Sequence, residues 1–198
     1  MQKNNTPTPE KKINVRWLTT MGMLAAIGIV LVAFIEVPLF PAAPFLKYDP
    51  ADIPILIGTM LYGPLSGVIL TIIVSFVQSF MIHGSGGPIG FVMHVIATGA
   101  MTIVLGNIFM RSKKTRVNAA VALTFGALAM TIAMIGMNLV LTPIFMNTPI
   151  DAVLKILVPV IIPFNLIKAG INSVVTFVLY RFVKTLIGHD FSYPMGNS

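Results

Sequence analysis

Long apolar segments fill most of this chain, and they constrain its fold more than any other feature of the sequence. The first, residues 17–35, contains no charged residue. As a helix rising 1.5 Å per residue it would cross roughly 30 Å of hydrocarbon. Only 10% of the residues are charged, whereas a soluble domain carries roughly a quarter. The sequence therefore predicts an all-α, multi-pass integral membrane protein without a separate soluble domain.

A second apolar stretch, residues 53–81, is interrupted by Gly63 and Pro64. As one straight helix it would be about 43 Å long, well beyond the thickness of the hydrocarbon core. Two helices joined by a turn at residues 62–64 would instead place the basic loop 111–116 on the same side as the basic N-terminal segment. Cytoplasmic loops are enriched in Lys and Arg, so this threading is preferred.

We therefore predict a compact bundle of six transmembrane helices with both termini cytoplasmic. Their approximate bounds are 15–35, 51–62, 65–82, 89–110, 117–142 and 162–186. They form one membrane domain, 15–187, between a disordered cytoplasmic tail, 1–14, and a C-terminal tail, 188–198. A proline-rich loop, 36–52, is expected to lie outside the hydrocarbon, and residues 151–158 to form a short interfacial helix.

The basic residues support this orientation. Of the 13 Lys and Arg residues, ten fall on the predicted inner side: Lys3, Lys11, Lys12, Arg16, Arg111, Lys113, Lys114, Arg116, Arg181 and Lys184. They stand in short clusters beside apolar runs, which indicates an orientation signal and contact with anionic membrane lipid, and not nucleic-acid binding.

Polar side chains gather at the opposite, predicted outer side. They are Glu36, Lys47, Tyr48, Asp49, Asp52, Gln78, His94, Asn138, Thr142, Asn165, Lys168 and Asn172. Polar groups within a membrane are costly and usually mark function. The pattern therefore predicts a polar cavity in the outer half of the bundle, open to a solute from outside.

Each of these residues also has a purely structural interpretation. Asp52, two residues before Pro54, is typical of a helix N-cap. His94 fits a packing residue, and Lys168 could extend its ammonium group to the interface. Asn138 and Asn165 could form hydrogen bonds between helices. The hypothesis of a binding site rests on their shared location.

Several classes of chemistry find no support in the sequence. The absence of cysteine excludes disulfides and thiol chemistry. No phosphate-binding loop, metal-ligand spacing or pair of carboxylates on one helix face is present. We therefore predict no catalytic residue, no metal and no cofactor. Energy for transport would come from another protein.

Two motifs indicate a family. The segment FLKYDPADIPILIG at residues 45–58, followed by LYGP at 61–64, resembles the substrate-binding S components of energy-coupling factor (ECF) vitamin transporters, most closely the riboflavin-specific ones. The resemblance implies a subunit in the bacterial plasma membrane that holds riboflavin in an outer-leaflet pocket. It also implies docking on a transmembrane T component with two cytoplasmic ATPases. The docking surface would include the small residues Gly22, Ala25 and Ala26.

The same resemblance suggests roles for the site residues. Asn138, Asn165 and Lys168 would donate to ring-edge or ribityl oxygens. Apolar walls would come from four side chains, and the polar remainder would serve hydroxyl groups or hold the loop. The full predicted set is Glu36, Phe45, Leu46, Tyr48, Asp49, Gln78, Met134, Asn138, Thr142, Asn165 and Lys168, with Phe45, Leu46, Tyr48 and Met134 as the walls.

Three alternatives stay open at this point. The chain could be an S component for another vitamin, since the residues require only a partly aromatic and partly polar ligand. It could be a self-sufficient secondary carrier for a small aromatic solute, although we find no line of ionisable residues running between the two faces. An integral membrane enzyme would need a nucleophile or a carboxylate pair.

Overall fold

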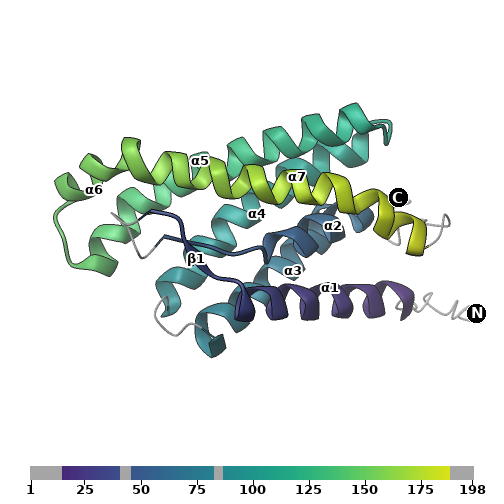
Figure 1. The fold of residues 1–198 in the computed structure, drawn as a ribbon, viewed down its shortest axis with the longest axis horizontal. Helices are drawn as coiled ribbons and strands as arrows, with labels where there is room; N and C mark the ends of the chain where they lie inside the picture. The colour runs from purple at the N-terminus through teal and green to yellow at the C-terminus, as the bar shows by residue number, and fades with distance from the viewer. Residues whose placement is uncertain (1–14, 41–45, 83–86, 188–198) are drawn as a thin grey trace, which may run out of the picture.

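The computed structural model describes residues 15–40, 46–82 and 87–187, so the predicted tails and Phe45 lie outside the described residues. The elements are α1 (Val15–Phe34), β1 (Val37–Pro38), β2 (Lys47–Tyr48), α2 (Asp52–Tyr62), α3 (Pro64–Val77), η1 (Gln78–Ile82), α4 (Gly87–Arg111), α5 (Arg116–Met146), α6 (Ile150–Ile156), η2 (Leu157–Ile161) and α7 (Ile162–Ile187). The helices form one elongated bundle (Figure 1). The start of α1 and the end of α7 lie at one end, and α6 lies at the other.

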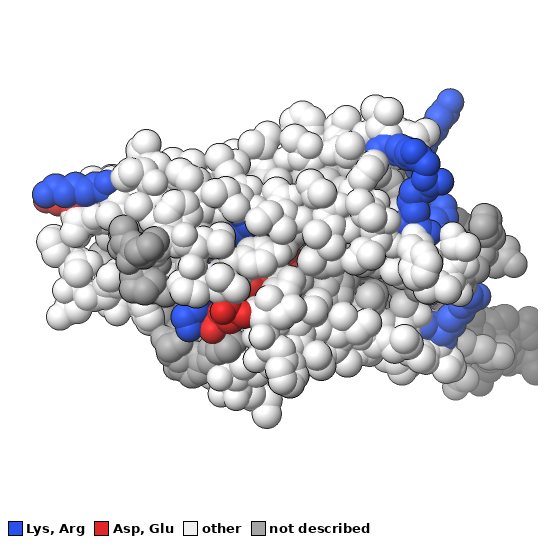
Figure 2. Space-filling view, viewed as in Figure 1, with Lys and Arg blue, Asp and Glu red and all other residues white. Residues whose placement is uncertain are grey.

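Membrane-spanning character is evident in the long helices. Among the described residues, five helices are long and apolar enough to cross a membrane: Val15–Phe34, Pro64–Ile82, Gly87–Arg111, Arg116–Met146 and Ile150–Leu186. Large apolar side chains are exposed on their outer surface, and Figure 2 shows the Lys and Arg side chains mainly at the two ends of the bundle, with a small charged group between them. The exposed apolar side chains include Leu18, Ile73, Ile132, Val174 and Phe182, which are 44% to 69% exposed. Lipid is the natural solvent for such a surface.

The predicted turn between two helices at Gly63 is confirmed. Helix α2 ends at Tyr62 and α3 begins at Pro64. Gly63 has φ 92°, in a region that residues with side chains rarely adopt, and Pro64 suits the first turn of a helix. With 11 residues, α2 is about 16 Å long and cannot span a bilayer alone. All its residues are buried, so α2 is the central element of the bundle.

The predicted end of the fifth span at residue 142 is wrong, because α5 continues through Pro143 to Met146. Pro143 removes one backbone N–H from the helix, and the chain nevertheless stays helical for about one further turn. The helix stops at Asn147, which is left-handed (φ 50°) and donates its N–H to the carbonyl of Pro143. Pro149 follows, and it cannot continue the helix.

The predicted gap before the last span is also wrong, since α6, η2 and α7 follow one another without a break from residue 150 to 187. Pro159 lies inside the π-helical turn η2. A wider turn accommodates the missing N–H of a proline, so the chain stays helical. A second π-helical turn, η1, carries Gln78 and Ser79. Such turns are frequent at functional sites.

The segment between α1 and α2 is not fully irregular, in contrast to the all-α expectation. Val37 and Pro38 pair antiparallel with Tyr48 and Lys47. Leu46 packs in a small apolar cluster with Val153, Val160, Ile161 and Phe164. The segment thereby lies across the bundle and against the first part of α7 (Figure 1).

Gly106 sets the closest approach between α4 and the α2–α3 turn. A Cβ at this position would lie 2.8 Å from the backbone of Pro64. A Cβ at Gly99, on the same helix and also buried, would meet nothing within 4 Å.

We expect Gly106→Ala to lower the free energy of unfolding in detergent by about 1–3 kcal/mol. Gly99→Ala should be neutral or stabilise by up to about 1 kcal/mol. Equal effects would contradict this packing.

Candidate functional site

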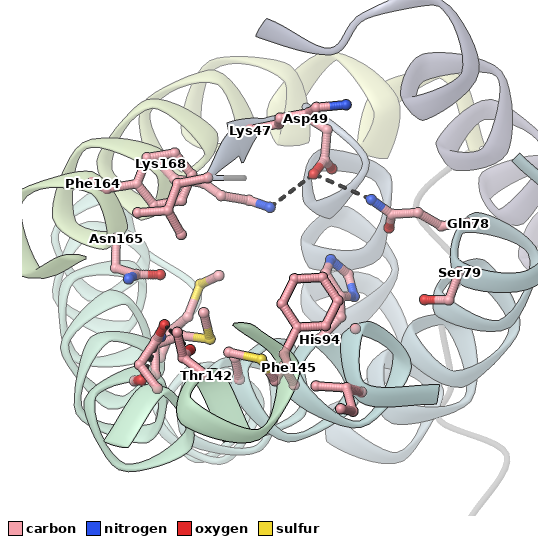
Figure 3. Close-up of a pocket in the computed structure, with 18 of the residues that line it drawn as sticks. Lys47, Asp49, Gln78, Ser79, His94, Thr142, Phe145, Phe164, Asn165 and Lys168 are labelled. Carbon is pink, nitrogen blue, oxygen red and sulfur yellow. Dashed lines mark hydrogen bonds and ion pairs between the residues drawn. The ribbon is translucent and has the colours of Figure 1, made fainter. Parts of the chain in front are cut away.

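A cavity of about 380 Å³ lies among η1, α4, α5, α7 and the segment before α2. Figure 3 shows its lining side chains arranged around an open centre. Its apolar part includes Leu46, Met134, Phe145 and Phe164, and its polar part includes Glu36, Asp49, Gln78, Ser79, His94, Asn138, Thr142, Asn165 and Lys168. Apolar walls with a few converging polar groups are typical of small-molecule sites of this size.

A buried ion pair forms one side of the cavity. The Lys168 Nζ donates to Asp49 Oδ2 at 2.9 Å, and both side chains are at most 7% exposed. Gln78 Nε2 donates to the same carboxylate oxygen at 3.4 Å. These contacts join α7 and η1 to the segment before α2, as the dashed lines in Figure 3 show. An ammonium group has three donors, so Lys168 keeps donors for a molecule in the cavity.

Asp52 does not cap α2, and the sequence-based interpretation of this residue is wrong. No side chain caps this helix. Asp52 is fully buried and accepts from Thr98 Oγ1 at 2.9 Å and from Asn172 Nδ2 at 3.1 Å. Its Oδ2 also lies 3.9 Å from the Lys168 Nζ. A buried carboxylate requires such partners, so Asp52 connects α2 to α4 and α7.

His94 extends this network toward α3. Its Nδ1 lies 2.7 Å from Ser75 Oγ, and its Nε2 lies 3.4 Å from Asp52 Oδ1. That nitrogen makes no hydrogen bond of good geometry, although His94 lines the cavity. His94 is therefore part of a polar network and not a simple packing residue.

The charges around Asp49 decide its protonation. Burial alone would raise the pKa of this carboxyl. The ammonium of Lys168, through its charge and its hydrogen bond, outweighs burial and holds the pKa of Asp49 below its ordinary value. Tyr48 differs, because burial and then the charge of Asp49 raise the pKa of its phenol. Asp49 thus stays ionised and Tyr48 stays protonated at neutral pH.

Two acceptors on the cavity wall have no hydrogen-bond partner among the described residues. Asn165 Oδ1 and Gln78 Oε1 are buried without a hydrogen bond, while the Asn165 amide nitrogen donates to the carbonyl of Ile161 at 2.8 Å. Leaving a buried acceptor unsatisfied costs roughly 1–3 kcal/mol. Such atoms on a cavity wall mark positions where a ligand with N–H or O–H groups could be bound.

The structure brings most of the predicted residues together. Nine of them line the cavity: Glu36, Leu46, Asp49, Gln78, Met134, Asn138, Thr142, Asn165 and Lys168. That they bind a ligand stays a prediction. Tyr48 does not line it, because its hydroxyl donates to Asn172 Oδ1 at 3.0 Å. The Lys47 Nζ is bound by Glu36 Oε2 at 3.0 Å.

The network residues Ser75 and Thr98 were not predicted, and Asn172 was predicted to lie in the polar cluster but not to bind the ligand. A signal for two of them exists in the helical spacing. Thr98 follows His94 by four residues, and Asn172 follows Lys168 by four, so each pair shares a helix face. Phe145 and Phe164 also line the cavity, but apolar residues of a membrane helix carry no such signal. Among the described residues, no group of three His, Asp or Glu side chains could hold a metal.

The small residues of α1 divide between two faces. Ala25 is only 8% exposed and belongs to the core, so it cannot contribute to an external docking surface. Gly22 and Ala26 are exposed, and a Cβ at Gly22 would meet nothing within 4 Å. Of these three small residues, only Gly22 and Ala26 are therefore available to a partner helix.

Comparisons with known proteins agree with this architecture. The family model of the substrate-specific component of ECF transporters matches residues 16–180. The chain is 34% identical to the riboflavin transporter FmnP of Bacillus subtilis, over 88% of this chain and 95% of that protein. It is 32% identical to the riboflavin transporter RibU of Staphylococcus aureus, over 86% of this chain and 93% of that one.

A solved structure shares the fold. It is described as the S component of a bacterial ECF transporter, and it superposes with a TM-score of 0.74 at 26% identity, covering 88% of this chain and 99% of its own. The resemblance inferred from the loop motif is thus confirmed, and the placement in the bacterial plasma membrane with it. The chain belongs to the substrate-specific S components of ECF transporters, a family of multi-pass membrane proteins.

Proposed function

We propose that this chain binds riboflavin in the cavity and serves its uptake as the substrate-binding subunit of an ECF importer. The observation that carries the proposal is the pair of unsatisfied acceptors, Asn165 Oδ1 and Gln78 Oε1, on the wall of an otherwise largely apolar cavity. The relatives described as riboflavin transporters align over most of this chain. Both facts support a ligand with a flat apolar body and several donors.

Riboflavin matches these requirements. Its ring system is flat and largely apolar, and it would lie against Leu46, Met134 and Phe164. The ring imide N–H and the ribityl hydroxyl groups are donors for Asn165 Oδ1 and Gln78 Oε1. A free N–H of Lys168 would donate to a ring carbonyl oxygen. Asn138 and Thr142, which hydrogen-bond each other at 2.9 Å, complete the polar side.

Charge favours riboflavin over its phosphate ester. Around the cavity, Lys168 is paired with Asp49 and Lys47 with Glu36. The third carboxylate, Asp52, has only polar side chains and the more distant Lys168 ammonium near it. No cation among the described cavity residues is left unpaired for a phosphate group. An added dianion would meet net repulsion, so the proposed ligand is the uncharged vitamin.

The proposed orientation places the cavity in the outer leaflet and both termini in the cytoplasm. In its support, the basic residues of the α4–α5 loop and of the end of α7 lie at the end that holds the start of α1 (Figure 2). A transmembrane T component and two ATPases would then supply energy from the cytoplasmic side. The proposed docking surface is the Gly22 and Ala26 face of α1, without the buried Ala25.

Riboflavin binding by the isolated chain tests the proposal. The purified protein should quench riboflavin fluorescence with a saturable 1:1 stoichiometry. Asn165→Leu should weaken binding about fivefold to tenfold, the value of one hydrogen bond. The matched control is Asn107→Leu, because Asn107 Nδ2 makes the same bond to the carbonyl four residues earlier, at 2.8 Å, but lies outside the cavity.

The comparison separates a binding role from a structural one. Asn107→Leu should leave riboflavin affinity unchanged, and both variants should unfold at similar temperatures. Equal loss of affinity in the two variants would remove Asn165 from the site. Absence of saturable quenching by the unmodified protein would refute the riboflavin proposal itself.

Orientation can be measured with single cysteines, because the chain has none of its own. Asp151 on α6 and Lys113 in the α4–α5 loop are both exposed. A membrane-impermeant maleimide should label Asp151→Cys in intact cells, and Lys113→Cys only after the cells are permeabilised. The opposite pattern would place the cavity in the inner leaflet.

A further inference from the structure

A second cavity, of about 400 Å³, lies between the start of α5 and the end of α7. Its rim carries four basic side chains: Lys114, Arg116, Arg181 and Lys184. The buried residues Ala119 and Tyr180 also line it, and Tyr180 packs edge-on against Phe109 at 5.5 Å. The cavity is therefore built on a rigid apolar base with cations around its opening.

These cations have no counter-charge in the described part of the chain. Its carboxylates are Glu36, Asp49, Asp52 and Asp151. The first three lie at or beside the riboflavin cavity, and Asp151 lies on α6, at the opposite end of the bundle. No ion pair involves Lys114, Arg116, Arg181 or Lys184 within the described residues.

The basic groups also disfavour one another. Burial, and then the positive charge of Lys184, lower the pKa of Lys114. Like charges held close together favour an anion that neutralises them. Arg side chains are suited to phosphate oxygens because their fork of N–H donors can bind two oxygens at once.

The surroundings of the cavity indicate where this anion comes from. Apolar residues that neighbour its lining residues in the sequence of the same two helices are exposed: Val117 is 70% exposed, Val178 65% and Phe182 66%. A free anion would gain nothing from such neighbours. A lipid would place its phosphate among the cations and its acyl chains along these side chains.

We propose that this cavity binds the phosphate of an anionic phospholipid headgroup, at the end of the bundle opposite α6. Two elements distant in sequence, the start of α5 and the end of α7, share the phosphate. The lipid would fix their separation in the membrane. The site is distinct from the riboflavin cavity and does not depend on the riboflavin proposal.

Native mass spectrometry of the full chain with added phosphatidylglycerol tests this site. Lys114→Gln with Arg116→Gln removes two lining charges. Arg111→Gln with Lys113→Gln is the matched control, because it removes the same charges from exposed residues beside the same loop that do not line the cavity. We expect the first double variant to bind phosphatidylglycerol roughly tenfold more weakly. The control should change binding less than about threefold.

Further binding measurements distinguish the possible ligands of this cavity. Phosphatidylcholine should bind much more weakly than phosphatidylglycerol, and inorganic phosphate at equal concentration should not displace the lipid. The unfolding temperature in detergent should be the same in both double variants, which verifies that each is folded. Equal losses in the two double variants, no preference for the anionic lipid, or displacement by inorganic phosphate would each overturn the proposal.

Discussion

The ion pair between Lys168 and Asp49 is the contact on which the arrangement of the site depends. Its two charges lie 2.9 Å apart and are almost completely buried. A buried charge that loses its partner costs roughly 3–5 kcal/mol, so α7 and the segment before α2 are held together. Asp52 joins the same network through Thr98 and Asn172. Every element that this network connects also contributes to, or directly supports, a wall of the cavity.

Such a network has a particular value in a membrane. Apolar helix faces gain little by turning from lipid toward each other, so helix packing relies on close contacts and on polar pairs. The fold uses both. Gly106 lets α4 approach the backbone of Pro64, and the ionised network fixes the opposite half of the bundle. The cavity lies beside this network, with apolar walls and unsatisfied acceptors available to a ligand.

Hydropathy and the Gly63–Pro64 break predicted the spans and the short central helix, because length and backbone conformation are local properties. The clustering of Asp49, Asn138, Asn165 and Lys168 was also predictable from their common end of the bundle. The partners of Asp52 were not predictable from the sequence. An aspartate at the start of a helix can cap the helix or form a buried ion pair, and the local sequence is the same in both cases. The continuous helix through Pro159 was missed for a similar reason: a π-helical turn depends on tertiary packing, which overrides the usual effect of proline.

A double-mutant cycle on the free energy of unfolding in detergent tests the central claim most directly, with Lys168→Met, Asp49→Asn and the combined variant. If this pair holds the loop over the cavity, each single variant is strongly destabilised because the other charge stays buried alone. The combined variant should then recover stability, with a coupling of about 1.5 kcal/mol or more. Additive effects, within about 0.5 kcal/mol, would contradict the account.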